Sequence, residues 1–181
     1  MVNKQETFMQ AYQPCHEPFV RYCSALAFGR MDTEDLIQDV LLSAYQHFEK
    51  IQKKGQFLHY LIRAARNKSI SNWRKRKFQQ GLLEKHTNQL MDKGLSPELS
   101  LDIGLMYRAL DKLPAKQSEA IILFEISGFS MKEIAAMQKR SEGAVKTTIS
   151  RGRKKLKDLL EDSASTHTPA HMLNTLQTIL L

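Results

Sequence analysis

The sequence has little of what marks secreted, membrane-spanning or catalytic proteins. It contains only two cysteines, Cys15 and Cys23, and they form no C-x-x-C pair. We therefore expect them to pack in the core rather than bind zinc, and we expect the chain in a reducing cytoplasm. No signal-peptide pattern opens the chain, and no apolar run is long enough to insert in a membrane. P-loop, Gly-x-Ser-x-Gly and glycine-fingerprint motifs are also missing, so the sequence predicts no enzyme, no cofactor and no metal.

Charge is the most informative part of the composition. Lys and Arg total 27 against 19 Asp and Glu, which gives a net charge of +8 in 181 residues. The surplus lies in two blocks, between residues 61 and 80 and between residues 146 and 157, while residues 31–49 contain acids and no Lys or Arg. Because solvated helix faces usually alternate in sign, two separate basic blocks favour two contacts with a nucleic-acid backbone.

Strand patterns do not stand out, whereas apolar residues recur at helical spacing throughout, so we predict an all-α fold. The predicted helices cover about residues 5–27, 33–48, 56–78, 97–113, 115–127, 131–137, 142–160 and 170–180. Residues 79–101 lack periodicity and contain glycine, serine and proline, which predicts a flexible linker. The linker would join an N-terminal domain (1–78) to a C-terminal domain (102–160), which is followed by a tail (161–181).

A helix-turn-helix motif is predicted between residues 130 and 160. Ser130 and Glu133 fit a capping box before a short helix, and Ser141 is placed to cap a longer one. The buried stripe of the longer helix is predicted to contain Val145, Ile149, Gly152, Leu156 and Leu160. In such motifs the second helix enters the major groove with its N-terminal residues nearest the bases. The predicted duplex contacts are Ser141, Glu142, Gly143, Lys146, Thr147, Ser150, Arg151, Arg153 and Lys154. The alternative is a basic helix in a small bundle, with its charges merely solvated.

The other basic block, in the predicted helix 56–78, is interleaved with aromatic residues. This mixture suits single-stranded DNA, because bases stack on aromatic rings while cations hold the backbone. Phe57 and Tyr60 could serve this purpose, but we favour a core position for both; Trp73 lies inside the basic run and is the better candidate. The predicted core stripe contains Leu58, Leu61, Ile62, Ala65 and Ile70. The predicted single-strand contacts are Arg63, Arg66, Asn67, Lys68, Trp73, Arg74 and Arg76.

Residues 32–40 (DTEDLIQDV) begin an acidic helix. Asp32 is placed to cap it, and Glu34 and Asp35 suit the positive end of the helix dipole. The predicted buried face contains Leu36, Val40, Ala44 and Phe48. Side chains available to a partner would be those of Asp32, Glu34, Asp35, Gln38 and Asp39. The alternative is an acidic surface helix that only supports the fold.

These segments together resemble a known family. Residues 113–117 (LPAKQ), 128–135 (GFSMKEIA), 141–146 (SEGAVK) and 150–156 (SRGRKKL) look like region 4 of extracytoplasmic-function sigma factors. Residues 32–40 and 57–67 (FLHYLIRAARN) look like parts of region 2. The family usually has Thr-Val-Lys-Ser-Arg where residues 144–148 are AVKTT, so Thr148 stands in place of an arginine that could bind a base or a phosphate.

The resemblance implies a transcription initiation factor without catalytic activity. Region 4 would read the promoter −35 element and contact the flap of RNA polymerase. The acidic helix of region 2 would dock on the clamp of the largest polymerase subunit, and its basic helix would open and read the −10 element. The implied partners are the RNA polymerase core, promoter DNA and an anti-sigma factor.

Two other classes of protein are compatible with parts of the sequence. A dimeric helix-turn-helix regulator would bind duplex operators, but it needs an apolar dimer face or an effector pocket rather than a basic aromatic helix. An inactive scaffold would bind polymerase without opening a promoter. The tail adds an apolar helical face with Met172, Leu173, Leu176, Ile179 and Leu180. We favour its packing on the chain's own C-terminal domain over a role as a latch or a partner dock.

Overall fold

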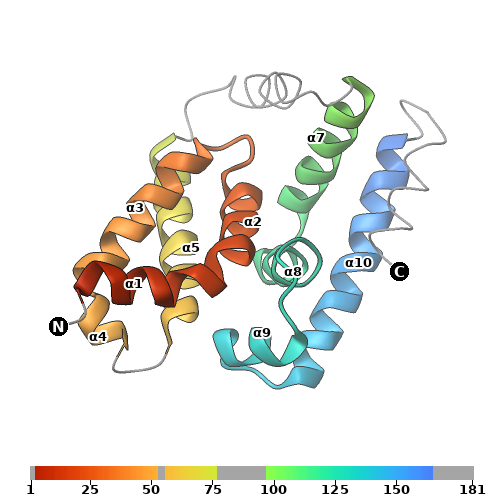
Figure 1. Cartoon of the computed structure of the whole chain (residues 1–181). Helices are drawn as coiled ribbons and strands as arrows, with labels where there is room; N and C mark the ends of the chain where they lie inside the picture. The colour runs from red at the N-terminus through yellow and green to blue at the C-terminus, as the bar shows by residue number, and fades with distance from the viewer. Residues whose placement is uncertain (1–2, 53–55, 77–96, 165–181) are drawn as a thin grey trace. The chain divides into compact units, whose positions relative to one another are not determined.

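The computed structural model describes residues 3–52, 56–76 and 97–164, all of its regular elements being helices (Figure 1). This confirms the predicted all-α class. The chain divides into two compact units, residues 1–84 and 85–181. The helix α7 (Pro97–Lys112) begins where a helix was predicted, so residues 97–101 are helical rather than part of the linker. The remainder of the predicted linker and the predicted tail helix at 170–180 lie outside the described residues.

The first unit contains α1 (Lys4–Tyr12), the 3₁₀ turn η1 (Gln13–Cys15), α2 (His16–Ala27), α3 (Thr33–Gln46), α4 (Phe48–Gln52) and α5 (Phe57–Arg76). The helices α2, α3 and α5 pack against one another, and α1 lies across them (Figure 1). The prediction of one helix over residues 5–27 is wrong, because η1 separates α1 from α2 at Pro14. A proline nitrogen carries no hydrogen to continue the α-helical ladder.

Aromatic rings fill the core of the first unit beneath α1. The ring of Phe8 lies 5.2 Å from that of Phe48 and 5.4 Å from that of Phe57, both edge to face, and Phe48 and Phe57 are 5.6 Å apart. Edge-to-face pairs each add about 0.5–1.5 kcal/mol beyond the area they bury. The hydroxyl groups of Tyr60 and Ser43 are hydrogen-bonded at 2.9 Å. Phe57 and Tyr60 are thus partly buried at the edge of this core, in contact with its residues.

The stripe predicted for α3 is confirmed, and that of α5 needs one correction. Leu36, Val40 and Ala44 are buried on α3. Phe48 is buried too, but it begins α4, because α3 ends at Gln46 rather than at the predicted residue 48. On α5, the side chains of Leu61, Ile62 and Ala65 are buried and that of Leu58 is partly so, but Ile70 is 40% exposed. Ser69 takes the buried position instead, since its hydroxyl donates to the carbonyl oxygen of Leu26 at 3.4 Å. A small hydroxyl that bonds a carbonyl of α2 lets the two helices approach closely.

The second unit contains α7, α8 (Ala115–Ile121), the π-helical segment η2 (Ile122–Ile126), α9 (Met131–Gln138) and α10 (Glu142–Ala164). The helix α10 packs against α7, α8 and α9 (Figure 1). The predicted helix 115–127 changes to π geometry at Ile122, where the Ser127 amide and hydroxyl both donate to the Ile122 carbonyl. Gly128 follows with φ 79°, a left-handed conformation that suits glycine and ends the helix.

Candidate nucleic-acid interface

The helices α9 and α10 form the predicted helix-turn-helix. Ser130 and Glu133 make the capping box of α9, with the Ser130 amide donating to the Glu133 carboxylate at 2.8 Å and the Glu133 amide donating to the Ser130 hydroxyl at 3.3 Å. The helix ends at Lys139, whose φ of 53° turns the chain. Ser141 then accepts a hydrogen bond from the Ala144 amide at 3.2 Å at the start of α10. Both serine caps were predicted from the sequence, but the left-handed residue was not, because the chain has lysine rather than glycine at that position.

One face of α10 is buried as predicted. Val145, Ile149, Leu156 and Leu160 are each at most 3% exposed. Gly152 lies against α8, where a Cβ atom would come within 2.8 Å of Ile121 Cδ1 and 3.3 Å of Gln117 Cβ. The helix is therefore held close to α8 along its inner side, and its outer side is turned to solvent.

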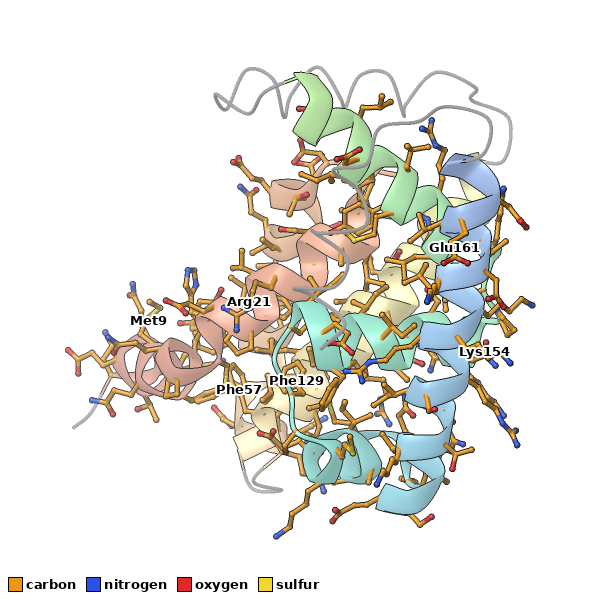
Figure 2. All side chains as sticks on the ribbon, turned by 90° about the vertical axis from the view of Figure 1, so that its right-hand side faces the viewer. Met9, Arg21, Phe57, Phe129, Lys154 and Glu161 are labelled. Carbon is orange, nitrogen blue, oxygen red and sulfur yellow. The ribbon has the colours of Figure 1, made fainter. Side chains whose placement is uncertain are left out.

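The outer side of α10 contains nearly all of the residues predicted to contact duplex DNA. Figure 2 shows Lys154 on the edge of the helix that points away from its neighbours. The Thr147 hydroxyl donates to the Gly143 carbonyl at 2.9 Å, which keeps its methyl group and hydroxyl in one orientation. Exposed members of the predicted set are Ser141, Glu142, Gly143, Lys146, Thr147, Ser150, Arg151 and Lys154.

Arg153 is placed differently from the other predicted DNA contacts. Its Nε donates to Glu125 Oε1 at 2.6 Å, and its guanidinium lies 5.6 Å from the centre of the Phe124 ring. The Glu125 side chain is only 8% exposed, so Arg153 neutralises a buried carboxylate of η2. Periodicity shows which face of a helix is polar, but it does not reveal an acid 28 residues earlier. Arg153 therefore has a structural partner within the second unit, and its contact with DNA stays a prediction.

Arg140, which the sequence analysis did not single out, joins the turn to α10. Its Nη2 donates to the Thr148 hydroxyl at 3.0 Å and to the Ala144 carbonyl at 3.4 Å. The signal that could have pointed to it is an arginine in the turn combined with a threonine in place of the family arginine at 148.

The basic helix α5 displays part of the predicted single-strand track. Arg63, Arg66, Asn67 and Lys68 are exposed. Lys68 Nζ lies 2.9 Å from Asp39 Oδ2, an ion pair that links α5 to the acidic helix α3. Backbone geometry places the remaining predicted residues in the last two turns of α5, and their side chains lie outside the description. These remaining residues are Trp73, Arg74 and Arg76.

The acidic helix α3 exposes all of the residues predicted to meet a protein partner. Asp32 Oδ1 accepts hydrogen bonds from the amides of Glu34 at 2.8 Å and Asp35 at 3.1 Å, so it caps the helix as predicted. Gln38 and Asp39 follow on the exposed side one turn later. Leu42 adds an apolar side chain, 59% exposed, beyond them. The exposed side of α3 thus combines acids, an amide and one leucine.

The two cysteines contribute to packing. Cys23 is fully buried, and burial raises the pKa of its thiol to about 12. The half-buried Cys15 thiol lies 3.5 Å from the Ala11 carbonyl oxygen, and burial raises its pKa as well. In the part of the chain that the structure describes, no three His, Cys, Asp or Glu side chains are grouped to hold a metal ion. His167 and His171, which stand four residues apart in the sequence as some metal-binding histidine pairs do, lie outside that part.

No helix among residues 3–52, 56–76 and 97–164 is both long and apolar enough to cross a membrane.

Comparison with known proteins gives a consistent result for both units. The sequence model of sigma-70 region 2 matches residues 11–79, and that of sigma-70 region 4 matches residues 103–156. The chain is 29% identical over 165 residues to the ECF RNA polymerase sigma factor SigX of Bacillus subtilis, covering 87% of this chain and 85% of that protein. It is 34% identical over 126 residues to the ECF RNA polymerase sigma factor SigF of Caulobacter vibrioides, covering 69% of each.

A solved structure agrees with these relatives. The sigma factor RpoE of Bartonella quintana, in complex with the anti-sigma factor NepR, superposes with a TM-score of 0.61 and 28% sequence identity. The match covers 86% of this chain and 98% of that one. The region 2 match contains the exposed acids of α3 and the basic helix α5, whereas the region 4 match contains α9 and α10 as far as Leu156.

Proposed function

The chain belongs to the extracytoplasmic-function sigma factors of the sigma-70 family, and we propose that its two units divide promoter recognition between duplex and single-stranded DNA. The second unit would bind the −35 element as duplex, and the first would bind the polymerase core and the −10 element. The observation that carries the proposal is the outer face of α10, which begins at the Ser141 cap and exposes Lys146, Thr147 and Ser150 in succession.

The N-terminal half of α10 is the part that we propose to enter the major groove. Glu142, Lys146 and Thr147 would lie nearest the bases, as the second helix of such motifs presents its first turns to base edges. Arg151 and Lys154, further along the same exposed side, would contact phosphates and set the position without specifying sequence. Gly143 would let the helix backbone approach the DNA closely, because it has no side chain beside Thr147.

On α5, the exposed cations and amide would follow the backbone of the melted strand, and Trp73 would stack on a base. Arg63 and Asn67 lie one helical turn apart on the exposed side, and Lys68 is held at the α3 edge by Asp39. Such a track combines electrostatic attraction with stacking, the two contributions that single-strand binding requires. The salt dependence of promoter binding should be steep, because each neutralised phosphate releases counterions.

Protein partners are proposed for the acids of α3 and for the factor as a whole. The exposed Asp35, Gln38 and Asp39 would dock on the clamp of the largest subunit of RNA polymerase, and the second unit would contact the flap. An anti-sigma factor is a further expected partner, by analogy with the Bartonella quintana complex. The polymerase, which works in the cytoplasm, would form the phosphodiester bonds, and this chain would perform no chemistry.

The function is tested by reconstitution with bacterial core polymerase. Purified chain and core are combined at low ionic strength with the DNA that lies upstream of the chain's own gene, and run-off transcripts are measured. We expect a discrete transcript that depends on the chain and disappears as salt is raised. A chain that does not associate with core under these conditions, or that associates without directing transcription, would contradict the proposal.

The role of Trp73 gives a sharper prediction. The Trp73→Ala variant should lower the open-complex fraction about tenfold, because one base loses a stacking partner worth about 1–3 kcal/mol. Closed-complex binding should remain within about twofold, since duplex contacts are left intact. Permanganate reactivity of unpaired thymines measures opening, and a mobility shift on ice measures closed binding. Trp73→Phe, which retains an aromatic face, is the matched control. If Trp73→Ala and Trp73→Phe gave the same open-complex fraction, Trp73 would not stack on a base as proposed.

A further inference from the structure

We propose that Arg140 is a positioning residue for −35 recognition, which holds the recognition helix α10 in its rotational setting through Thr148; this rests on the proposed function. Arg140 Nη2 donates to the Thr148 hydroxyl at 3.0 Å and to the Ala144 carbonyl at 3.4 Å. The Thr148 hydroxyl in turn donates to the same Ala144 carbonyl at 2.7 Å. One guanidinium nitrogen, one hydroxyl and one carbonyl therefore form a closed set of contacts on the first two turns of α10.

The backbone of Arg140 is fixed on the other side of the motif. Its amide donates to the carbonyl of Ala135 in α9 at 2.9 Å, directly after the left-handed residue Lys139. Arg140 thus holds α9 with its main chain and α10 with its side chain. A residue bonded to both helices of a helix-turn-helix restrains the angle between them and the rotation of the second helix about its axis.

The surroundings of the guanidinium favour an action through the helix rather than a direct contact with DNA. Arg140 and Thr148 are only partly exposed, and Arg140 Nη1 is buried with no hydrogen-bonding partner. A cation placed to bind a phosphate would instead present its nitrogens to solvent, as the exposed Arg151 and Lys154 are placed to do.

The position of the contact on α10 decides what it controls. Ala144 and Thr148 lie one turn apart on the edge between the buried stripe and the outer face. Thr147, adjacent to Thr148, is exposed, as is Gly143, adjacent to Ala144. Rotation of α10 about its axis would move Thr147 and Lys146 relative to the base edges, so a restraint on this edge sets which bases they can reach. The Thr148 hydroxyl is the side-chain atom at this edge that the Arg140 guanidinium binds.

Binding of the reconstituted holoenzyme to two DNA duplexes tests the proposal. One duplex has the chain's own promoter and the other has the same promoter with its −35 bases scrambled, and both dissociation constants are measured across a salt series. Thr148→Val removes the hydroxyl while keeping the shape of the side chain, and Arg140→Met removes the guanidinium while keeping the apolar stem. Each should lower the ratio of specific to scrambled affinity about tenfold, and the double variant should be no worse than either single one.

The salt series separates positioning from a phosphate contact. For both Arg140→Met and Thr148→Val, the slope of log affinity against log salt should equal that of the wild type. Arg151→Met is the matched control, whose slope should fall by about one with little change in the ratio. A slope that falls by about one in Arg140→Met would overturn the proposal in favour of direct phosphate binding.

Two further outcomes would also overturn it. An unchanged ratio in Arg140→Met would mean that the contact is without consequence for recognition. If Arg140→Met lowered the ratio of specific to scrambled affinity and Thr148→Val did not, Arg140 would not act through the Thr148 hydroxyl. A wild-type holoenzyme that binds both duplexes equally would contradict the proposed −35 recognition itself. That outcome differs from a wild type that prefers its own promoter and variants that keep the same preference.

Discussion

The Arg153→Met variant is expected to destabilise the second unit by about 2–3 kcal/mol, because it leaves the carboxylate of Glu125 buried without its cation. Arg153 Nε donates to Glu125 Oε1 at 2.6 Å, and the Glu125 side chain is 8% exposed. Breaking a buried ion pair from one side costs about 3–5 kcal/mol. We expect less because the Arg153 side chain remains 34% exposed, where water already screens part of the attraction.

Hydrogen exchange is the suitable measurement for this variant, since it follows the amides of α8 and α10 separately from the first unit. Arg151→Met, on the exposed side of α10, is the control: it should change the free energy of unfolding obtained from exchange by no more than about 0.5 kcal/mol. Replacing both partners, as Glu125→Leu with Arg153→Met, should recover most of the loss, because no unpaired charge then remains. If hydrogen exchange in Arg153→Met matched the wild type while promoter binding weakened, Arg153 would act as a DNA contact rather than through its ion pair with Glu125.

Arg153 also illustrates how far the sequence could predict this site. Helical periodicity identified the buried stripe of α10 and the outer face opposite it, because burial depends on residue type and spacing along one helix. The partners of Arg153 and Arg140 depend on contacts between helices, with Glu125 in one case and across the turn in the other. A pattern within one segment carries no information on such contacts, so the sequence did not reveal the partner of Arg153 and did not single out Arg140.

The elements show the same division between local and tertiary information. The caps at Asp32, Ser130 and Ser141 were predicted correctly, because each involves side chains within three residues of the amides they bind. Ile70 was predicted in the core from its apolar side chain alone, whereas the structure buries Ser69. Only the neighbouring carbonyl of Leu26, contributed by α2, explains why a hydroxyl is accommodated there.

Reversing one charge on α3 is expected to weaken the association with polymerase core about 30- to 100-fold. In the Asp35→Arg variant a cation replaces an exposed acid of the proposed docking face, and a like charge placed against a complementary surface costs several kcal/mol. The cap of α3 should survive, because Asp32 bonds the backbone amide of residue 35 and not its side chain. The unfavourable cation in the first turn should cost the helix only about 0.3–1 kcal/mol.

The matched control for this reversal is Glu17→Arg, which makes the same change in net charge at an exposed site on α2. Titration of labelled chain with core polymerase at several salt concentrations measures both variants. Asp39→Asn should have a smaller effect than Asp35→Arg, because it removes a charge that Lys68 already neutralises in part at 2.9 Å.

Equal weakening by Asp35→Arg and Glu17→Arg would mean that core polymerase responds only to the total charge of the chain, which would contradict the docking face on α3. A loss confined to α3 would place the clamp contact on the side of the helix that exposes Asp35, Gln38 and Asp39, since only the location of the charge differs between the variants.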